Sequence, residues 1–129
     1  MIIIFSRYKF IFYLLNFVLI FLYLFPGSIL GYFLYNDIKK QPKITPDFWI
    51  STNHLYAFLI ISAVGFFTFN KTEQFKAISI YLILLSIILE FLHLLIPERS
   101  FQLSDLFGNL IGVIIIVIIS FLLKKNEKY

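Results

Sequence analysis

The sequence predicts an all-α, polytopic membrane protein, a four-transmembrane-helix bundle that forms a single domain over residues 1–129. Apolar residues make up 60% of the chain and charged residues only 14%, whereas soluble domains carry about 25% charged residues. The mean hydropathy is +0.92. Four separate apolar segments approach the roughly 20 residues that a helix needs to cross a bilayer. This pattern excludes a soluble enzyme and a disordered tail.

The four predicted spans cover approximately residues 10–26, 48–69, 77–96 and 105–123. Pro26 and Pro97 end the first and third spans, because proline cannot continue a helix. The segment Thr45-Pro46-Asp47 is typical of a helix start, with a hydroxyl cap, a proline and an acid in the first turn. Ser104 is a candidate cap for the fourth span.

The positive charges predict the orientation of the chain. With four spans, one side of the membrane would carry seven positive residues and the other would carry four, namely Arg7, Lys9, Lys71, Lys76, Lys124, Lys125 and Lys128 against Lys39, Lys40, Lys43 and Arg99. Cytoplasmic loops are enriched in Lys and Arg. We therefore expect a multi-pass protein of the cell inner (plasma) membrane with both termini in the cytoplasm. The net charge is +4, and the Lys and Arg residues are scattered along the chain instead of forming a run. This pattern predicts membrane lipids as partners and no nucleic acid.

Polar side chains gather in one leaflet of the predicted bundle. His54, Glu90 and Asn109 lie roughly 6–10 Å below the outer helix ends at about 1.5 Å per residue. Glu90 shares one helical face with His93, and Asn109 shares another with Asp105. A charged side chain at mid-helix costs roughly 2.5–3.5 kcal/mol on insertion scales. We therefore expect both faces to point into the bundle.

Seven of these positions fall in a spaced pattern, Glu90-x2-His93-x3-Pro97-x-Arg99-x5-Asp105-x3-Asn109-x2-Gly112. The pattern resembles the signature of the VanZ-like family of small bacterial membrane proteins, commonly E-x2-Q-x3-P-x-R-x5-D-x3-N-x2-G. His54-x3-Phe58 is similar to the H-x3-Y that the family often has at the start of its second span. The resemblance implies a four-span bacterial membrane protein and, for the family's namesake, a link to glycopeptide (teicoplanin) resistance. It brings no settled reaction with it.

This chain departs from the family pattern at two places. His93 stands where the family usually has Gln. Ile50 and Ser51 occupy the region where an acid–Lys pair often precedes the His of the second span.

The candidate catalytic residues are Glu90 and His93, which are neighbours at i, i+3 on a helix. They form either an acid/base pair or a structural hydrogen-bonded pair that holds helices together. No P-loop, G-x-S-x-G or H-E-x-x-H motif is present. Whether the protein is an enzyme therefore stays open.

The candidate binding residues are Arg99, Asp105, Asn109 and His54. Arg99 offers a planar fork that suits a phosphate or carboxylate, and its alternative role is to pair with an acid or a lipid headgroup. Asp105 also suits the positive end of a helix dipole, and Asn109 also suits a hydrogen bond between helices. Tyr23 is interpreted as an interfacial aromatic.

We expect no bound metal and no cofactor. His54, His93, Glu90 and Asp105 combine imidazole and carboxylate ligands. However, the family tolerates Gln at the position of His93, and Gln is a poor ligand for transition metals.

Three functions remain open from the sequence. The first is a resistance or envelope protein that acts at the outer face on a lipid-linked envelope precursor or a glycopeptide. The second is an intramembrane hydrolase or transferase that acts on a lipid phosphate. The third is a structural or assembly subunit of a membrane complex. An oligomer is compatible with all three.

Overall fold

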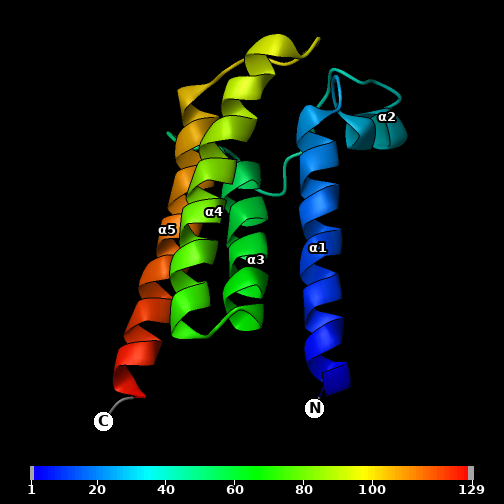
Figure 1. The fold of residues 1–129 in the computed structure, drawn as a ribbon. Coiled ribbons are helices and arrows are strands. Elements are labelled where there is room, and N and C mark those ends of the chain that lie inside the picture. The colour runs from blue at the N-terminus through cyan, green and yellow to red at the C-terminus, as the bar shows by residue number, and fades with distance from the viewer. Residues whose placement is uncertain (1, 128–129) are drawn as a thin grey trace.

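The computed structural model describes residues 2–127, and these residues form helices without any strand. The elements are α1 (Ile2–Leu24), α2 (Ile29–Tyr35), α3 (Thr52–Thr68), α4 (Thr72–Leu92), a short 3-10 helix η1 (His93–Leu95) and α5 (Leu103–Asn126). The long helices α1, α3, α4 and α5 run side by side, and both chain ends lie at the same end of the molecule (Figure 1). Lys128, which entered the charge count, lies outside the described residues.

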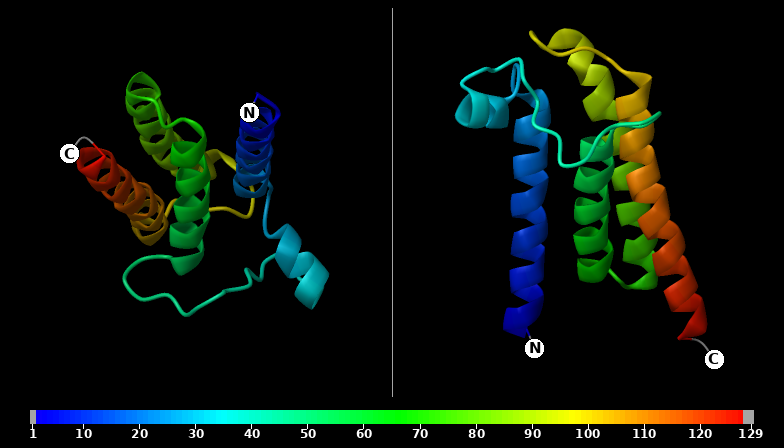
Figure 2. Two further views of the ribbon diagram at one scale, coloured as in Figure 1. Left: turned by 90° about the horizontal axis from the view of Figure 1, so that it is seen from below. Right: turned by 180° about the vertical axis from the view of Figure 1, so that it is seen from behind.

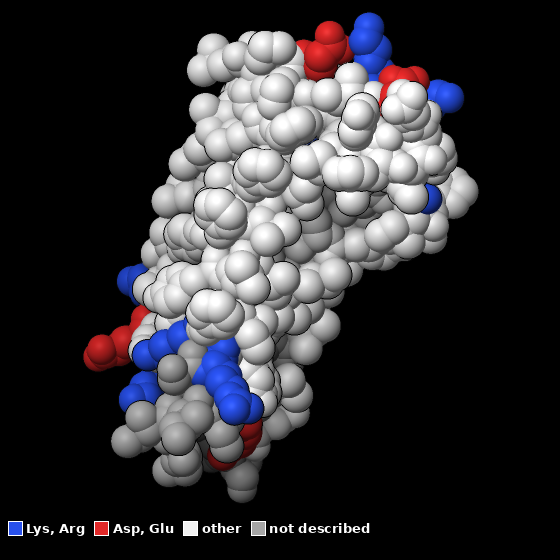
Figure 3. All heavy atoms as spheres, turned by 90° about the vertical axis from the view of Figure 1, so that its right-hand side faces the viewer, with Lys and Arg blue, Asp and Glu red and all other residues white. Residues whose placement is uncertain are grey.

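Three helical stretches are long and apolar enough to cross a membrane, namely Arg7–Leu24, Glu73–Leu95 and Leu103–Asn126. The prediction of an all-helical protein with several membrane helices is thus confirmed. Helix α3 is apolar but has only 17 residues, or about 25 Å at 1.5 Å per residue. A side view shows a broad uncharged band between charged groups at the two ends (Figure 3).

Helix α3 begins at Thr52, so the predicted start of the second span at residue 48 is wrong. The segment before it forms a capping loop instead of a helical turn. Asp47 Oδ1 accepts hydrogen bonds from the Thr52 backbone N–H at 3.0 Å and from the Thr52 hydroxyl at 3.1 Å. The same hydroxyl lies 2.8 Å from the Thr45 carbonyl. The N-cap of α3 is Ser51, so the predicted roles of Thr45 as the cap and of Pro46 and Asp47 in the first turn are wrong, although Asp47 contacts the first helical residue from outside the helix.

The other helix ends follow the prolines. Helix α1 ends at Leu24, just before Pro26. Helix α4 passes into η1, and Ile96 then takes an extended conformation before Pro97, because a residue that precedes proline avoids the helical region. The cap of α5 is Gln102 and not Ser104, so the predicted capping residue of the fourth span is wrong.

Helix α3 contacts each of the other long helices and lies between α1 and the α4–α5 pair (Figure 2). The closest approach is between α3 and α5. A Cβ added at Gly108 would lie 2.6 Å from the Ser51 carbonyl oxygen, and one at Gly112 would lie 2.8 Å from that of Leu55. Gly108 and Gly112 form a G-x-x-x-G motif. They allow the backbones of α3 and α5 to come close, as such motifs do in membrane helices.

Helix α2 lies crosswise to α1 at the end of the bundle that is opposite the chain termini (Figures 1 and 2). The Ser28 side chain caps its first turn at 2.9 Å from the Gly31 N–H, and Asn36 ends it in a left-handed conformation with φ 53°. Gly31 has no room for a side chain, because a Cβ there would overlap the Lys40 carbonyl. Phe33 is 76% exposed. An apolar helix that lies across the bundle end suits a membrane–water interface.

Candidate functional site

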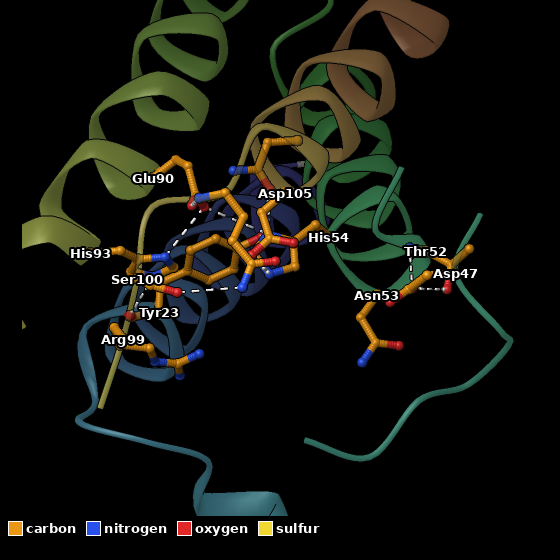
Figure 4. A network of polar contacts seen from close by, with 12 residues as sticks. Tyr23, Asp47, Thr52, Asn53, His54, Glu90, His93, Arg99, Ser100 and Asp105 are labelled. Carbon is orange, nitrogen blue, oxygen red and sulfur yellow. Dashed lines mark hydrogen bonds and ion pairs between the residues drawn. The ribbon is translucent and has the colours of Figure 1, made fainter. Parts of the chain in front are cut away.

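A buried polar network lies where α1, α3, α4 and α5 meet, near the end that carries α2 (Figure 4). The Tyr23 hydroxyl donates a hydrogen bond to Asn109 Oδ1 at 2.7 Å. His54 Nδ1 lies 3.0 Å from the same oxygen and 3.1 Å from the Tyr23 hydroxyl. Asn109 Nδ2 donates to the Ser86 carbonyl of α4 at 3.1 Å. Asn109 therefore joins side chains or carbonyls of all four long helices.

Glu90 and His93 lie beside this network and are almost fully buried, at 0% and 2% exposure. Glu90 Oε1 accepts the backbone N–H of Gln102 at 3.0 Å. His93 Nε2 lies 2.9 Å from the Tyr23 carbonyl oxygen, so its N–H donates a hydrogen bond to that oxygen. Glu90 Oε2 and His93 Nδ1 are 3.3 Å apart. Among the described residues, neither of these two atoms has a hydrogen-bond partner.

Asp105 faces the other side of the His54 ring. Its Oδ2 lies 3.7 Å from His54 Nε2, and Glu90 Oε2 lies 4.0 Å from His54 Nδ1. One ligand atom from each of His54, Glu90 and Asp105 falls within 4.8 Å of the others. The His54 ring therefore sits between two carboxylates that come from different helices.

Arg99 joins the loop between η1 and α5 to the end of α1. Its Nε donates to the Phe25 carbonyl at 3.1 Å, and its Nη2 donates to the Leu22 carbonyl at 2.8 Å. Leu22 lies in the last turn of α1 and Phe25 follows the helix directly, and carbonyls at a helix C-terminus have no partners within the helix. Burial lowers the pKa of Arg99, whereas Tyr23, Asp105 and Glu90 raise it. An arginine remains charged throughout the physiological range.

A cavity of about 740 Å³ opens beside this network. Its wall contains His54, His93, Arg99 and Asp105 together with apolar side chains of α1, α2 and α3, namely Leu19, Leu22, Leu30, Leu34, Ala57 and Ile60. The lining of the cavity therefore combines polar side chains of the network with hydrocarbon side chains. Pockets for small ligands are typically of this size and of this mixed character.

The loop that borders the cavity is held by an ion pair. Lys43 Nζ lies 2.7 Å from Asp47 Oδ2. This hydrogen bond lowers the pKa of Asp47, and the hydrogen bonds from Thr52 lower it further, while slight burial opposes them. These contacts therefore favour the ionised form of Asp47, which accepts the hydrogen bonds from Thr52.

The structure brings together all six residues that the sequence analysis selected, which are His54, Glu90, His93, Arg99, Asp105 and Asn109. Glu90 and Asn109 are both fully buried, as predicted from the faces that they share with other polar residues. What these residues bind or catalyse stays a prediction.

Sequence analysis missed Tyr23, and its interpretation as an interfacial aromatic is wrong. The side chain is 8% exposed, and its ring stacks on His93 with centroids 5.7 Å apart. One signal was present in the sequence. Tyr23 precedes Pro26 by three residues, so it lies at the same depth as the other polar residues.

Comparison of the chain with models of known protein families, with curated proteins and with solved structures found no match.

Proposed function

We propose that this chain is a VanZ-like protein of the bacterial plasma membrane, with α1, α3, α4 and α5 as four spans. It binds an amphiphilic envelope component at the outer face. The single observation that carries this proposal is the cavity of about 740 Å³ whose lining combines polar and apolar side chains. An amphiphile has the same division between headgroup and hydrocarbon.

The seven-position pattern supports the family assignment. The pattern spans residues 90–112, and its members lie in one region of the structure together with His54 of the separate His54-x3-Phe58 match. Gly112 allows α5 to approach α3, Asn109 bonds to His54 and Ser86, and Glu90 and Asp105 flank His54. A pattern that arose by chance would have no reason to converge in this way.

The arrangement of the helices supports a fourth span. The two ends of the described chain lie at one end of the molecule (Figure 1), which is consistent with an even number of crossings. Helix α3 lies between α1 and the α4–α5 pair (Figure 2). A short span is tolerated where neighbouring helices surround it, or where the bilayer thins locally.

The ligand class follows from the mixed lining of the cavity. A hydrocarbon chain would lie along Leu19 and Ile60, and a headgroup would lie against Arg99 and His54. Arg99 retains its Nη1 group, which makes no hydrogen bond among the described residues. Lys39 is also at the cavity wall. The lining also contains the carboxylates Asp47, Glu98 and Asp105, so the support for an anionic headgroup, such as the phosphate of a lipid-linked envelope precursor, comes from the open Nη1 of Arg99.

The test is lipid binding by the purified full chain in nanodiscs, measured by native mass spectrometry with a polyprenyl phosphate as the probe. Ile60→Trp fills the apolar part of the lining and should reduce binding at least tenfold. Ile118→Trp is the matched control, because Ile118 lies on α5 outside the cavity and is 52% exposed. Equal binding by both variants would refute the cavity as the ligand site and would favour a structural subunit.

The orientation has its own test. From the distribution of Lys and Arg, the polar network should lie in the outer leaflet. A reporter fused after Tyr129 should be active as green fluorescent protein and inactive as alkaline phosphatase. An alkaline phosphatase fusion that is active would move the network to the inner leaflet.

One observation favours an intramembrane hydrolase or transferase as a second candidate. Glu90 Oε2 and His93 Nδ1 are buried, 3.3 Å apart and without hydrogen-bond partners among the described residues. Such a pair can pass a proton to or from a bound ligand. Lipid and precursor profiling of cells with and without the protein separates the two candidates. A new covalent species that requires Glu90 would establish turnover, and unchanged chemistry would leave binding alone.

A further inference from the structure

Three side chains from three helices form a cluster with the composition of a metal site. His54 of α3, Glu90 of α4 and Asp105 of α5 each offer a ligand atom within 4.8 Å of the others. The separations are 3.7 Å for His54 Nε2 to Asp105 Oδ2 and 4.0 Å for His54 Nδ1 to Glu90 Oε2. Ligand atoms around a tetrahedral ion at about 2.1 Å lie about 3.4 Å apart. The distances among the three ligand atoms, which reach up to 4.8 Å, would therefore have to shorten by as much as about 1.4 Å to close the cluster around an ion.

An independent observation points to a ligand at this place. Glu90 Oε2 is fully buried and has no hydrogen-bond partner among the described residues, although its companion Oε1 accepts the Gln102 N–H. A buried carboxylate oxygen is costly unless it is paired or coordinates a cation. This oxygen lies 4.0 Å from His54 Nδ1 and 3.3 Å from His93 Nδ1, so both imidazole rings are close to it.

The charges around the cluster also call for a cation. Glu90 and Asp105 bring two carboxylates to His54, and His93 Nδ1 also lies 3.3 Å from Glu90 Oε2 (Figure 4). Both imidazoles carry a positive charge only when they are protonated. Arg99 is the nearest permanent cation, and its Nε and Nη2 are engaged with carbonyls of α1. In a low-dielectric interior, an acid pair without a counter-charge is strongly unfavourable. A divalent ion supplies that charge.

The surroundings orient the ligands as they do in known metal sites. A metal-binding histidine normally donates its other ring N–H to a carbonyl or carboxylate oxygen. His54 Nδ1 lies 3.0 Å from Asn109 Oδ1, which leaves Nε2, on the side of Asp105, free to bind a metal. The backbone N–H of Gln102 holds Glu90 in the same way. Because His54 and Asp105 line the cavity, a water molecule or a ligand oxygen can complete the coordination.

We propose that His54, Glu90 and Asp105 bind one Zn²⁺ ion, with the remaining position open to the cavity. One imidazole and two carboxylates suit Zn²⁺ better than the soft or square-planar metals. The sequence analysis expected no metal because it counted His93 as a ligand, and the family usually has Gln there. In the structure, His93 Nε2 is bonded to the Tyr23 carbonyl, and His93 is not among the three clustered residues. A Gln at that position would therefore leave the proposed ligands intact.

The experiment measures metal binding by the full chain in detergent, with the affinity tag removed and the protein treated with a chelator. Titration with ZnCl₂ in a calorimeter, checked by elemental analysis, should give one Zn²⁺ per chain. His54→Ala, Glu90→Gln and Asp105→Asn should each weaken the affinity at least tenfold. Glu98→Gln is the matched control, because Glu98 is an exposed carboxylate at the same end of the bundle, and it should bind Zn²⁺ like the unaltered chain.

Two further measurements keep the proposal testable if a ligand variant fails to fold. Replacement of Zn²⁺ by Co²⁺ in the unaltered chain should give the intense visible bands of a four- or five-coordinate site. His93→Gln should keep the stoichiometry. No saturable Zn²⁺ binding in the folded chain, equal loss in Glu98→Gln, or full binding by folded His54→Ala would each overturn the proposal. Loss of binding in folded His93→Gln would overturn the assigned ligand set. Because the probe is the metal alone, failure here leaves the lipid-binding test unaffected.

Discussion

Replacement of Tyr23 by phenylalanine removes one atom from the centre of the polar network and leaves the packing of the ring unchanged. The hydroxyl donates to Asn109 Oδ1 at 2.7 Å, and both residues are buried. A hydrogen bond contributes about 1 kcal/mol net in soluble proteins and averages about 0.6 kcal/mol between membrane helices. Asn109 Oδ1 keeps His54 Nδ1 as a second partner at 3.0 Å. Tyr23→Phe should therefore lower the free energy of unfolding by about 0.6–1 kcal/mol.

Asn109→Leu should cost more, because it removes the contacts with Tyr23, His54 and the Ser86 carbonyl together. Three bonds at about 0.6–1 kcal/mol each give a loss of about 2–3 kcal/mol. In the double variant, the shared bond is lost only once. The two substitutions should therefore be non-additive by about 0.6–1 kcal/mol, which is the coupling energy of the Tyr23–Asn109 bond.

The assay is reversible unfolding in mixed micelles with increasing dodecyl sulfate, followed by far-UV circular dichroism. Tyr13→Phe is the matched control, because Tyr13 lies on the same helix, is 60% exposed and should change stability by less than about 0.5 kcal/mol. A Tyr23→Phe variant as stable as Tyr13→Phe, together with additive effects in the double variant, would show that the network does not hold α1 to the bundle.

The other predictions concern packing, the Arg99 contacts and pH. Gly112→Ala should destabilise the fold by about 1–3 kcal/mol in the same assay, because its Cβ meets backbone at 2.8 Å, whereas Gly65→Ala meets a ring edge at 3.0 Å and should cost less. If the two substitutions cost the same, close backbone approach does not limit this interface. Arg99→Lys keeps the charge but loses the two-carbonyl geometry, so it should impair complementation almost as much as Arg99→Ala at equal membrane levels; full rescue by Lys would mean that only the charge matters. The pKa of Asp47 is lower in the folded chain than the unfolded value of 3.8. The ionised carboxylate therefore stabilises the fold above pH 3.8, and this stabilisation is lost as the pH falls through the lower pKa of the folded state. Melting curves below pH 4 should therefore converge with those of Asp47→Asn, and a constant difference at every pH would contradict this account.

The membrane helices were predictable because hydropathy is a local property of the chain. Pro26 and Pro97 mark helix ends at or near the observed ones. The start of α3 was predicted wrongly because Asp47 reaches the first helical residue from a loop that is longer than one helical turn. The contact between Asp47 and Thr52 at 3.0 Å spans five residues and requires the intervening chain to turn, which residue preferences over one helical turn do not encode.

The depth of His54, Glu90 and Asn109 also followed from the sequence, because position along a helix sets depth in the bilayer. Helical faces predicted that Glu90 avoids lipid, and it is fully buried. The role of Tyr23 did not follow, because an amphipathic ring near a helix end suits either the interface or a buried hydrogen bond. Only the neighbours of the ring decide between the two.

The sequence by itself determined that the chain is a helical membrane protein, because the length of an apolar segment is a local property. It also determined which polar residues lie at one depth, because the position of a residue along a helix sets its depth. Only the tertiary structure decided which of them touch. It placed Arg99 on the carbonyls of α1, kept His93 out of the cluster, and set His54 between Glu90 and Asp105. The physical reason is that these contacts depend on the rotation and spacing of separate helices. Those quantities are set by packing across the bundle, as at Gly108 and Gly112, and no local pattern specifies them.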